Sequence, residues 1–175
     1  MINIKILFRF IFLFLIIPVQ TSASENIVYL DLQYILSNSL AGKSIISQIK
    51  RIENDNAKLF IAKEKDLKKE ETKLISKKKI LNENKFKSKI KELKKKINSH
   101  NQKKKSTIND INKKNFDAQN KILDVLKNKL ADYAEKNSIK LILQKNNILL
   151  GANEIDITKT IMVLLNKEIK TVNIK

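Results

Sequence analysis

The stretch NIVYLDLQYILSNSLAGK, residues 26–43, changes its character within a few residues. Residues 27–30 form a short β-prone run, and the next residue, Asp31, is a type that often begins helices. The stretch closes at Gly42, one of only two glycines in the chain. From residue 43 to residue 137 there is no Gly and no Pro, and Lys, Asn, Ile, Leu and Glu dominate. This pattern predicts a short strand joined to a long helical segment.

The first residues of the chain have the pattern of a signal peptide, which we place at residues 1–23. Lys5 and Arg9 give a positive start, an apolar run ends at Pro18, and Thr21-Ser22-Ala23 supplies small residues for cleavage. The uncharged part of the run, residues 10–17, is too short to span a bilayer, which argues against a retained anchor. No cysteine follows it, which excludes lipoprotein processing. We expect cleavage after Ala23, with Ser24 as the alternative, and export to a bacterial periplasm.

The 152 residues that follow are unevenly organised. Because the exported chain has no cysteine, it cannot use disulfides or thiolate metal sites, so packing or oligomerisation must stabilise it. Residues 24–42 and 138–175 contain nearly all the β-like apolar runs, but together they have only 57 residues, near the size at which a lone core is marginal. We predict an α+β fold in which this small body buries its apolar surface against copies of itself. Residues 43–137 form an arm.

The arm has the pattern of an antiparallel helical hairpin, with apolar residues at coiled-coil spacing in two blocks. The first block is Ile45, Ile49, Ile52, Leu59, Leu67, Leu74 and Leu81. The second block is Phe86, Ile90, Leu93, Ile97, Ile108, Ile111, Ala118, Ile122, Val125 and Leu130. The rhythm is lost between the blocks, so we place the tip near residues 81–86, with residues 98–101 as the competing position. Polar residues interrupt this seam at Asn56, Lys63, His100 and Lys104, which predicts a flexible hairpin.

The excess positive charge lies on the arm. Residues 43–137 contain 27 lysines and one arginine against 13 acidic residues, a net charge of +15, whereas the body has six lysines against five acids. Residues 77–105 alone carry +11. Export, the scarcity of arginine and the presence of a single aromatic residue, Phe86, within the basic run argue against nucleic acid as a partner. The candidate partners of the basic arm are therefore acidic client proteins, lipopolysaccharide and anionic lipid surfaces. The alternative is that the lysines reflect the codon bias of an AT-rich genome and bind no partner.

The sequence predicts no catalytic, metal or cofactor site. His100 is the only histidine, and we expect it to be a solvated polar residue of the basic arm. There is no cysteine and no nucleophile motif from which a catalytic set could be built around it. The acidic residues lack calcium-binding spacing, and neither glycine belongs to a phosphate-binding loop. These observations argue against an enzyme.

The C-terminal segment supplies the rest of the body. Residues 139–143 are predicted to be a second strand, Asn146-Asn147 a turn, and residues 148–150 a third strand that Gly151 closes. Asp156-Ile157-Thr158 offers an N-cap for a last helix.

Motifs near the two ends of the mature chain carry a family resemblance. The first is Val28-Tyr-Leu-Asp-Leu-Gln33 followed by Ser39-Leu-Ala-Gly-Lys43, and the second is Asp156-Ile-Thr158 followed by Leu165-Asn166. With the signal peptide and the basic hairpin, they make the chain similar to the Skp/OmpH family of periplasmic chaperones over essentially its whole mature length. Two positions depart from the family pattern: Leu40 stands where proline is frequent, and Gln144 where an Asp often ends the second strand.

The resemblance implies a jellyfish-shaped trimer whose body is a small β-barrel shared by three subunits. The three arms would enclose a cavity in which family members hold unfolded outer-membrane proteins without ATP. The trimer body is then predicted to include Ile27, Val28, Leu30, Leu141, Leu143 and Leu149. Contacts with clients or an anionic surface are predicted for Lys77, Lys78, Lys79, Lys85, Lys87, Lys91, Lys94 and Lys95.

Two other interpretations of the chain stay open. An envelope structural protein, with a coiled coil that bridges membrane and wall, would form a rigid oligomer without affinity for unfolded clients. A peripheral protein that binds anionic lipid would attach to liposomes as the folded protein alone.

Overall fold

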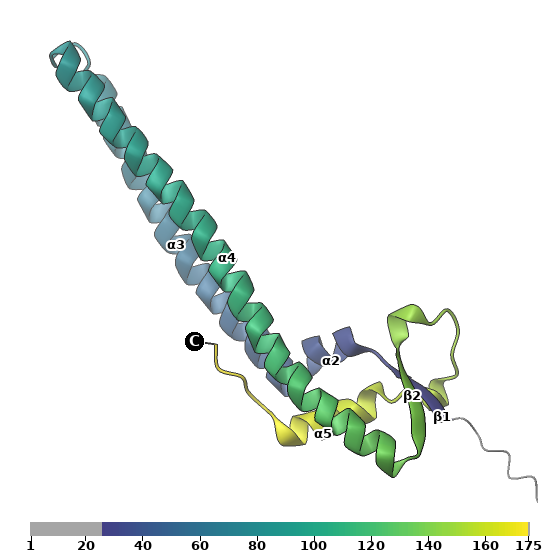
Figure 1. Ribbon diagram of the computed structural model, residues 1–175. Helices are drawn as coiled ribbons and strands as arrows, with labels where there is room; N and C mark the ends of the chain where they lie inside the picture. The colour runs from purple at the N-terminus through teal and green to yellow at the C-terminus, as the bar shows by residue number, and fades with distance from the viewer. Residues whose placement is uncertain (1–25, 175) are drawn as a thin grey trace, which may run out of the picture.

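A long helical arm projects from a small body (Figure 1). The computed structural model describes residues 26–174, so the predicted signal peptide lies outside the described residues. The larger elements are β1 (Asn26–Leu30), α2 (Leu32–Asn38), α3 (Leu40–Ser76), α4 (Glu83–Lys136), β2 (Ile139–Gln144) and α5 (Thr158–Glu168). Two 3-10 turns, η1 (Lys145–Asn147) and η2 (Asn153–Ile155), lie between β2 and α5. Helices α3 and α4 pack against each other along the arm.

The sheet of the body has two parallel strands, with Ile27 opposite Leu141 in the register of β1 and β2. Parallel strands need a long crossover, and here the whole arm supplies it. The third strand predicted at residues 148–150 is wrong, because these residues form a loop in the described chain. The chain rejoins the sheet only later, where the Ile157 amide donates to the Tyr29 carbonyl at 2.9 Å.

The core of the body includes the base of the arm. Its fully buried large side chains come from both helices of the hairpin and from α2 and α5: Ile35, Ile45, Ile122, Leu126, Ile161 and Leu165. The first turns of α3 and the last turns of α4 therefore pack within the body, and the arm is anchored there before it emerges (Figure 1).

Hydrogen bonds join the two ends of the chain at the base of the arm. The Asp31 amide donates to the Thr158 hydroxyl at 2.8 Å, and the Leu40 amide donates to Asn166 Oδ1 at 2.8 Å. Both pairs connect the N-terminal motif of the sequence with the C-terminal one. The two motifs thus meet in space and fix where α3 begins.

Gly42 allows α2 and α3 to pack closely at this junction. A Cβ at position 42 would lie 1.9 Å from the Leu36 carbonyl oxygen, so the backbone has to shift to accept one. We expect Gly42→Ala to destabilise the protein by about 1–3 kcal/mol, the usual cost of overpacking. Thermal unfolding followed by circular dichroism measures this effect, with the exposed Lys43→Ala as the control. Equal melting temperatures for the two variants would contradict the prediction.

Candidate functional site

The tip of the arm is a turn at residues 77–82, between the end of α3 and the start of α4. It lies earlier in the chain than the predicted position near 81–86, because Asn82 is the N-cap of α4 and its Oδ1 accepts from the Asn84 amide at 2.8 Å. Residues 83–86 therefore belong to the second helix and not to the tip. The competing tip at residues 98–101 is wrong, since these residues lie inside α4.

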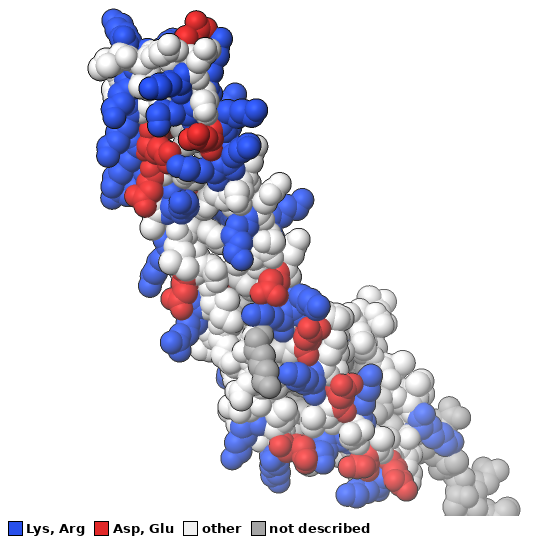
Figure 2. Space-filling view, turned by 60° about the vertical axis from the view of Figure 1, so that its left-hand side comes forward, with Lys and Arg blue, Asp and Glu red and all other residues white. Residues whose placement is uncertain are grey.

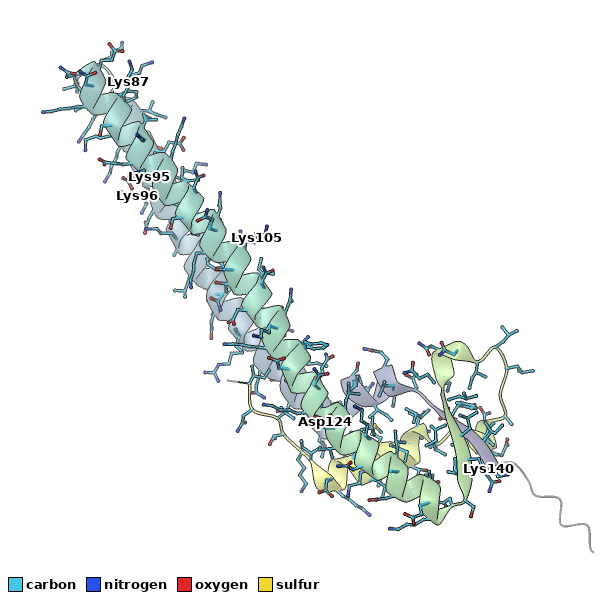
Figure 3. All side chains as sticks on the ribbon, viewed as in Figure 1. Lys87, Lys95, Lys96, Lys105, Asp124 and Lys140 are labelled. Carbon is cyan, nitrogen blue, oxygen red and sulfur yellow. The ribbon has the colours of Figure 1, made fainter. Side chains whose placement is uncertain are left out.

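The eight predicted contact lysines surround this tip, and all are exposed. Lys77, Lys78 and Lys79 lie in the turn, and the other five lie on the first turns of α4, where Figure 3 labels Lys87 and Lys95. Lys87 pairs with Glu83 at 2.6 Å. The other seven make no ion pair within residues 26–174. On the face shown in Figure 2, basic side chains crowd the tip, all of them lysines because residues 77–105 contain no arginine, so its positive charge is largely uncompensated.

The seam between α3 and α4 has an apolar part at each end of the arm and a polar part between them. Ile49 and Ile111 belong to the body-side cluster, and Leu67 and Leu93 to the tip-side cluster. Residues between these clusters include Asn56 and Thr107, which are half-buried.

Two apolar residues predicted to lie in the seam are exposed, as are the predicted seam lysines Lys63 and Lys104. Leu59 is 67% and Ile108 is 50% exposed, while their neighbours Phe60 and Thr107 are half-buried. The seam advances by four residues from Asn56 to Phe60 instead of by three, which turns Leu59 outward. The prediction failed at Leu59 because the adjacent apolar Phe60 fits the heptad almost equally well, and at Ile108 because the half-buried residue beside it, Thr107, is polar.

His100 is buried in the seam, so its prediction as a solvated residue is wrong. Its Nε2 lies 3.4 Å from Glu64 Oε1, and its ring packs edge-on against Phe60 with centroids 5.7 Å apart. Lys104 Nζ lies 3.1 Å from the same Glu64 oxygen. Hydrogen bonds from Lys104 and then from His100 lower the pKa of Glu64. His100 is buried because its spacing from Ile97 continues the seam.

We expect His100→Ala to lower the free energy of unfolding by about 0.5–3 kcal/mol, since it removes a packed ring from the hairpin. His100→Leu should keep or raise the stability, because it extends the apolar seam beside Phe60. Chemical unfolding of both variants tests this. A His100→Ala variant as stable as the unchanged protein would show that the ring packing contributes nothing.

The residues predicted to form the trimer body fall into two groups. Val28 and Leu30 are buried in the chain's own core. The remaining four are exposed in this single chain: Ile27, Leu141, Leu143 and Leu149. Leu149 and its neighbour Leu150, which is absent from the predicted set, are 104% and 92% exposed. The apolar run 148–150 is the signal that could have added Leu150.

The loop that presents these two leucines is anchored to β1. The Tyr29 hydroxyl donates to the Ala152 carbonyl at 3.1 Å, and a Cβ at Gly151 would lie 2.7 Å from the Tyr29 ring. Lys145 pairs with Asp156 at 2.6 Å across the base of the loop. The exposed leucines therefore project from a loop that is fixed at both ends.

Comparison with known proteins identifies the family. The model of a family described as outer membrane protein (OmpH-like) matches residues 26–165. The chain belongs to the OmpH-like family. The crystal structure of a candidate OmpH-like outer membrane chaperone from Caulobacter crescentus CB15 is similar in fold, with a TM-score of 0.79 and 18% identity over 86% of this chain and 89% of that one. The sequence matches no curated protein. The family predicted from the two terminal motifs is thus confirmed.

This OmpH-like chain has a C-terminal segment beyond the family match that packs on the arm. The Val172 side chain is buried, and its carbonyl accepts from Gln48 Nε2 at 2.7 Å. The Ile174 amide donates to Gln48 Oε1 at 3.2 Å. One glutamine side chain thus holds the segment against α3.

Neither a metal site nor a membrane-spanning helix is found in the part of the OmpH-like chain that the structure describes. Residues 26–174 contain no group of histidines and acids placed to hold a metal ion. Within the same range, each helix is too short or too polar to cross a membrane.

Proposed function

We propose that this OmpH-like protein is a periplasmic chaperone that holds unfolded outer-membrane proteins, without ATP, between the arms of a homotrimer. The observation that carries the proposal is the OmpH-like match over residues 26–165, on a chain whose arm ends in uncompensated lysines. The similarity in fold to an OmpH-like outer membrane chaperone supports the same role.

The physical properties of such clients fit the arm. Strands of membrane barrels alternate apolar and polar residues, and unfolded barrels aggregate through exposed edges and apolar side chains. An arm that separates one client from others need only bind it weakly at many points. Lysines draw in acidic clients and also keep the arms of different molecules apart by repulsion. Insertion of the client into the membrane would then release it without a chemical step.

The homotrimer is supported by the apolar surface that the single chain leaves exposed. Leu149 and Leu150 are almost fully accessible, and Leu141 and Leu143 of β2 are partly so. Association of bodies would bury these side chains and bring three anchored arms to one side of a shared core.

We expect the protein to suppress aggregation when a urea-unfolded membrane barrel protein is diluted into buffer. Light scattering should fall as the concentration of the OmpH-like protein rises, and it should be nearly abolished once trimers exceed clients. Adding ATP should change nothing. An equal mass of a folded protein of similar charge, such as lysozyme, serves as the control. Undiminished scattering at a trimer excess would refute the proposed function.

A second candidate function is binding to an anionic surface, which the seven lysines without an ion pair at the tip favour. This function predicts that the folded protein alone sediments with vesicles that contain anionic lipid or lipopolysaccharide, and not with zwitterionic vesicles. Exposed charges act over about a Debye length, ~8 Å at physiological salt, so added salt should release the protein.

A further inference from the structure

The arm of this OmpH-like protein has an apolar groove where its seam is polar. The groove lies between α3 and α4 in the half of the arm nearer the body, and its volume is about 310 Å³. Its apolar lining comes from both helices: Ala57, Phe60, Ile61, Ile108 and Ile111. Ile61 is 64% and Ile108 is 50% exposed, so two large β-branched side chains stand open to solvent at the mouth of the groove.

The polar seam explains why the groove exists. Asn56 and Thr107 line it where apolar side chains would otherwise interlock across the hairpin, so the two helices leave space between them. A second groove shares Phe60 but is lined by lysines of both helices, Lys63, Lys95, Lys96 and Lys103. By helical periodicity, the α4 residues that line the apolar groove and those that line the second groove lie on opposite sides of the seam. The two flanks of the arm therefore offer different chemistry.

The dimensions of the apolar groove suit an extended chain. Ala57 and Ile61 are one helical turn apart, about 6 Å along α3. Side chains on the same face of a β-strand repeat at about 6.6–6.8 Å. Alternate apolar side chains of an extended segment can therefore enter between successive turns of the two helices. A helical segment also repeats side chains at about 6 Å on one face, so the choice of an extended segment comes from the proposed clients, whose strands alternate apolar and polar residues.

The charge of the arm decides between occupants. The charged residues that line the groove are Glu53 and Lys104, and Lys104 is already paired with Glu64 at 3.1 Å. The groove therefore binds apolar side chains, and acidic residues of the same segment have to face outward, toward the exposed lysines of the arm. A second arm of this chain would bring another segment with a net charge of +15 against the first, which repulsion opposes. A flexible chain with acidic residues is instead attracted by the tip lysines and then meets an apolar groove.

We propose that this groove binds alternate apolar side chains of an extended, acidic client segment, such as one unfolded strand of a membrane barrel. The proposal rests on the proposed chaperone function and assigns part of its client binding to Ala57, Ile61 and Ile108. The lysines control how fast clients arrive, and the groove controls how long they stay.

The test compares three variants of the full protein. Ile61→Ser/Ile108→Ser removes the apolar mouth of the groove. Ile75→Ser/Ile80→Ser makes the same change at two residues that are 59% and 82% exposed at the tip end, and is the matched control. Ala57→Trp fills the groove while it adds apolar surface. Every side chain changed in these variants is exposed, so we expect the fold to survive each change.

The probe is a fluorescein-labelled peptide of twelve residues in which Leu or Val alternates with Ser and Asp, and anisotropy measures its binding. A second peptide of the same composition has its apolar residues in one block. We expect the alternating peptide to bind more tightly than the block peptide. Ile61→Ser/Ile108→Ser and Ala57→Trp should each raise the Kd of the alternating peptide by about tenfold or more, and the control by less than about twofold.

Three results would overturn the proposed groove site. The first is an unchanged Kd of the alternating peptide for Ile61→Ser/Ile108→Ser, and the second is a lower Kd for Ala57→Trp. The third is an equal loss of affinity in Ile61→Ser/Ile108→Ser and in the control variant. A change in the sedimenting mass of the groove variant would also overturn it, since the groove would then be a subunit contact. If the unchanged protein still suppresses aggregation of a barrel protein in any of these cases, the chaperone function stands and only the groove fails.

Discussion

Replacing both Leu149 and Leu150 with Asp should leave the protein monomeric, whereas the unchanged protein should sediment as a trimer. The two leucines are 104% and 92% exposed in the single chain, and the loop that carries them is held by the hydrogen bond from Tyr29 to Ala152. Burying a leucine side chain is worth about 1.5–3 kcal/mol. Three subunits would each contribute two leucines, and charged side chains at those positions would be costly to bury. We therefore expect loss of assembly with little change in the isolated chain.

Analytical ultracentrifugation at micromolar concentration measures the result. Ile80→Asp is the matched control, because Ile80 is 82% exposed but lies at the tip of the arm, far along the chain from the body. This control should stay trimeric. A wild-type protein that sediments as a monomer would contradict the proposed trimer itself. A trimeric Leu149→Asp/Leu150→Asp variant would show that the loop lies outside the interface.

The features that were predictable from the sequence are those that local patterns determine. Asp31 is the N-cap of α2 and accepts from the Tyr34 amide at 2.8 Å. Asp156 accepts from the Thr158 amide at 2.9 Å just before α5, whose N-cap is Ile157. The long run without Gly or Pro forms the hairpin. These features depend on residues within a few positions of one another, so propensity and capping suffice.

The features that could not be predicted depend on distant contacts or on a choice between equivalent residues. Residues 148–150 have β-prone composition, but pairing needs a free edge, and the chain bonds to Tyr29 through Ile157 instead. The loss of the apolar rhythm predicts the tip near residues 81–86, whereas the Asn82 side chain caps α4 and the turn ends there. The spacing of His100 from Ile97 places it in the seam, but its partners there, Glu64 and Phe60, lie far earlier in the sequence and follow only from the register of the hairpin.

The apolar groove of the candidate site could not be predicted from the sequence either, because it depends on residues that are distant in the chain. Ile61 and Ile108 are separated by most of the hairpin in sequence, and Ile61 belongs to no seam pattern. Their proximity follows only from the position of the tip turn, which sets the register between α3 and α4. An error of a few residues at the tip would have paired other side chains. The exposed lysines at the tip, by contrast, can be located from the sequence because charge density needs no register, and their contact with clients stays a prediction.

Changing Lys91, Lys94 and Lys95 to Gln should slow client capture by about three- to tenfold at low salt, while the protein stays trimeric and equally helical. These three residues are exposed near the tip and make no ion pair within the described chain, so their charge acts fully on an approaching client. Gln keeps a similar helix propensity, which isolates the effect of charge. Stopped-flow fluorescence of a labelled, acidic membrane barrel protein measures the rate.

The matched control removes the same charge near the body, through Lys113, Lys121 and Lys136, which are also exposed. If the tip steers encounter, only the tip variant should be slow at low salt. Raising the salt concentration shortens the Debye length to about 3 Å at 1 M, so it should slow the unchanged protein until it matches the tip variant. Dissociation rates should differ little, because burial of apolar client segments sets them. Equal rates for the tip and body variants at low salt would mean that the position of the lysines is irrelevant, and that they reflect codon usage and solubility.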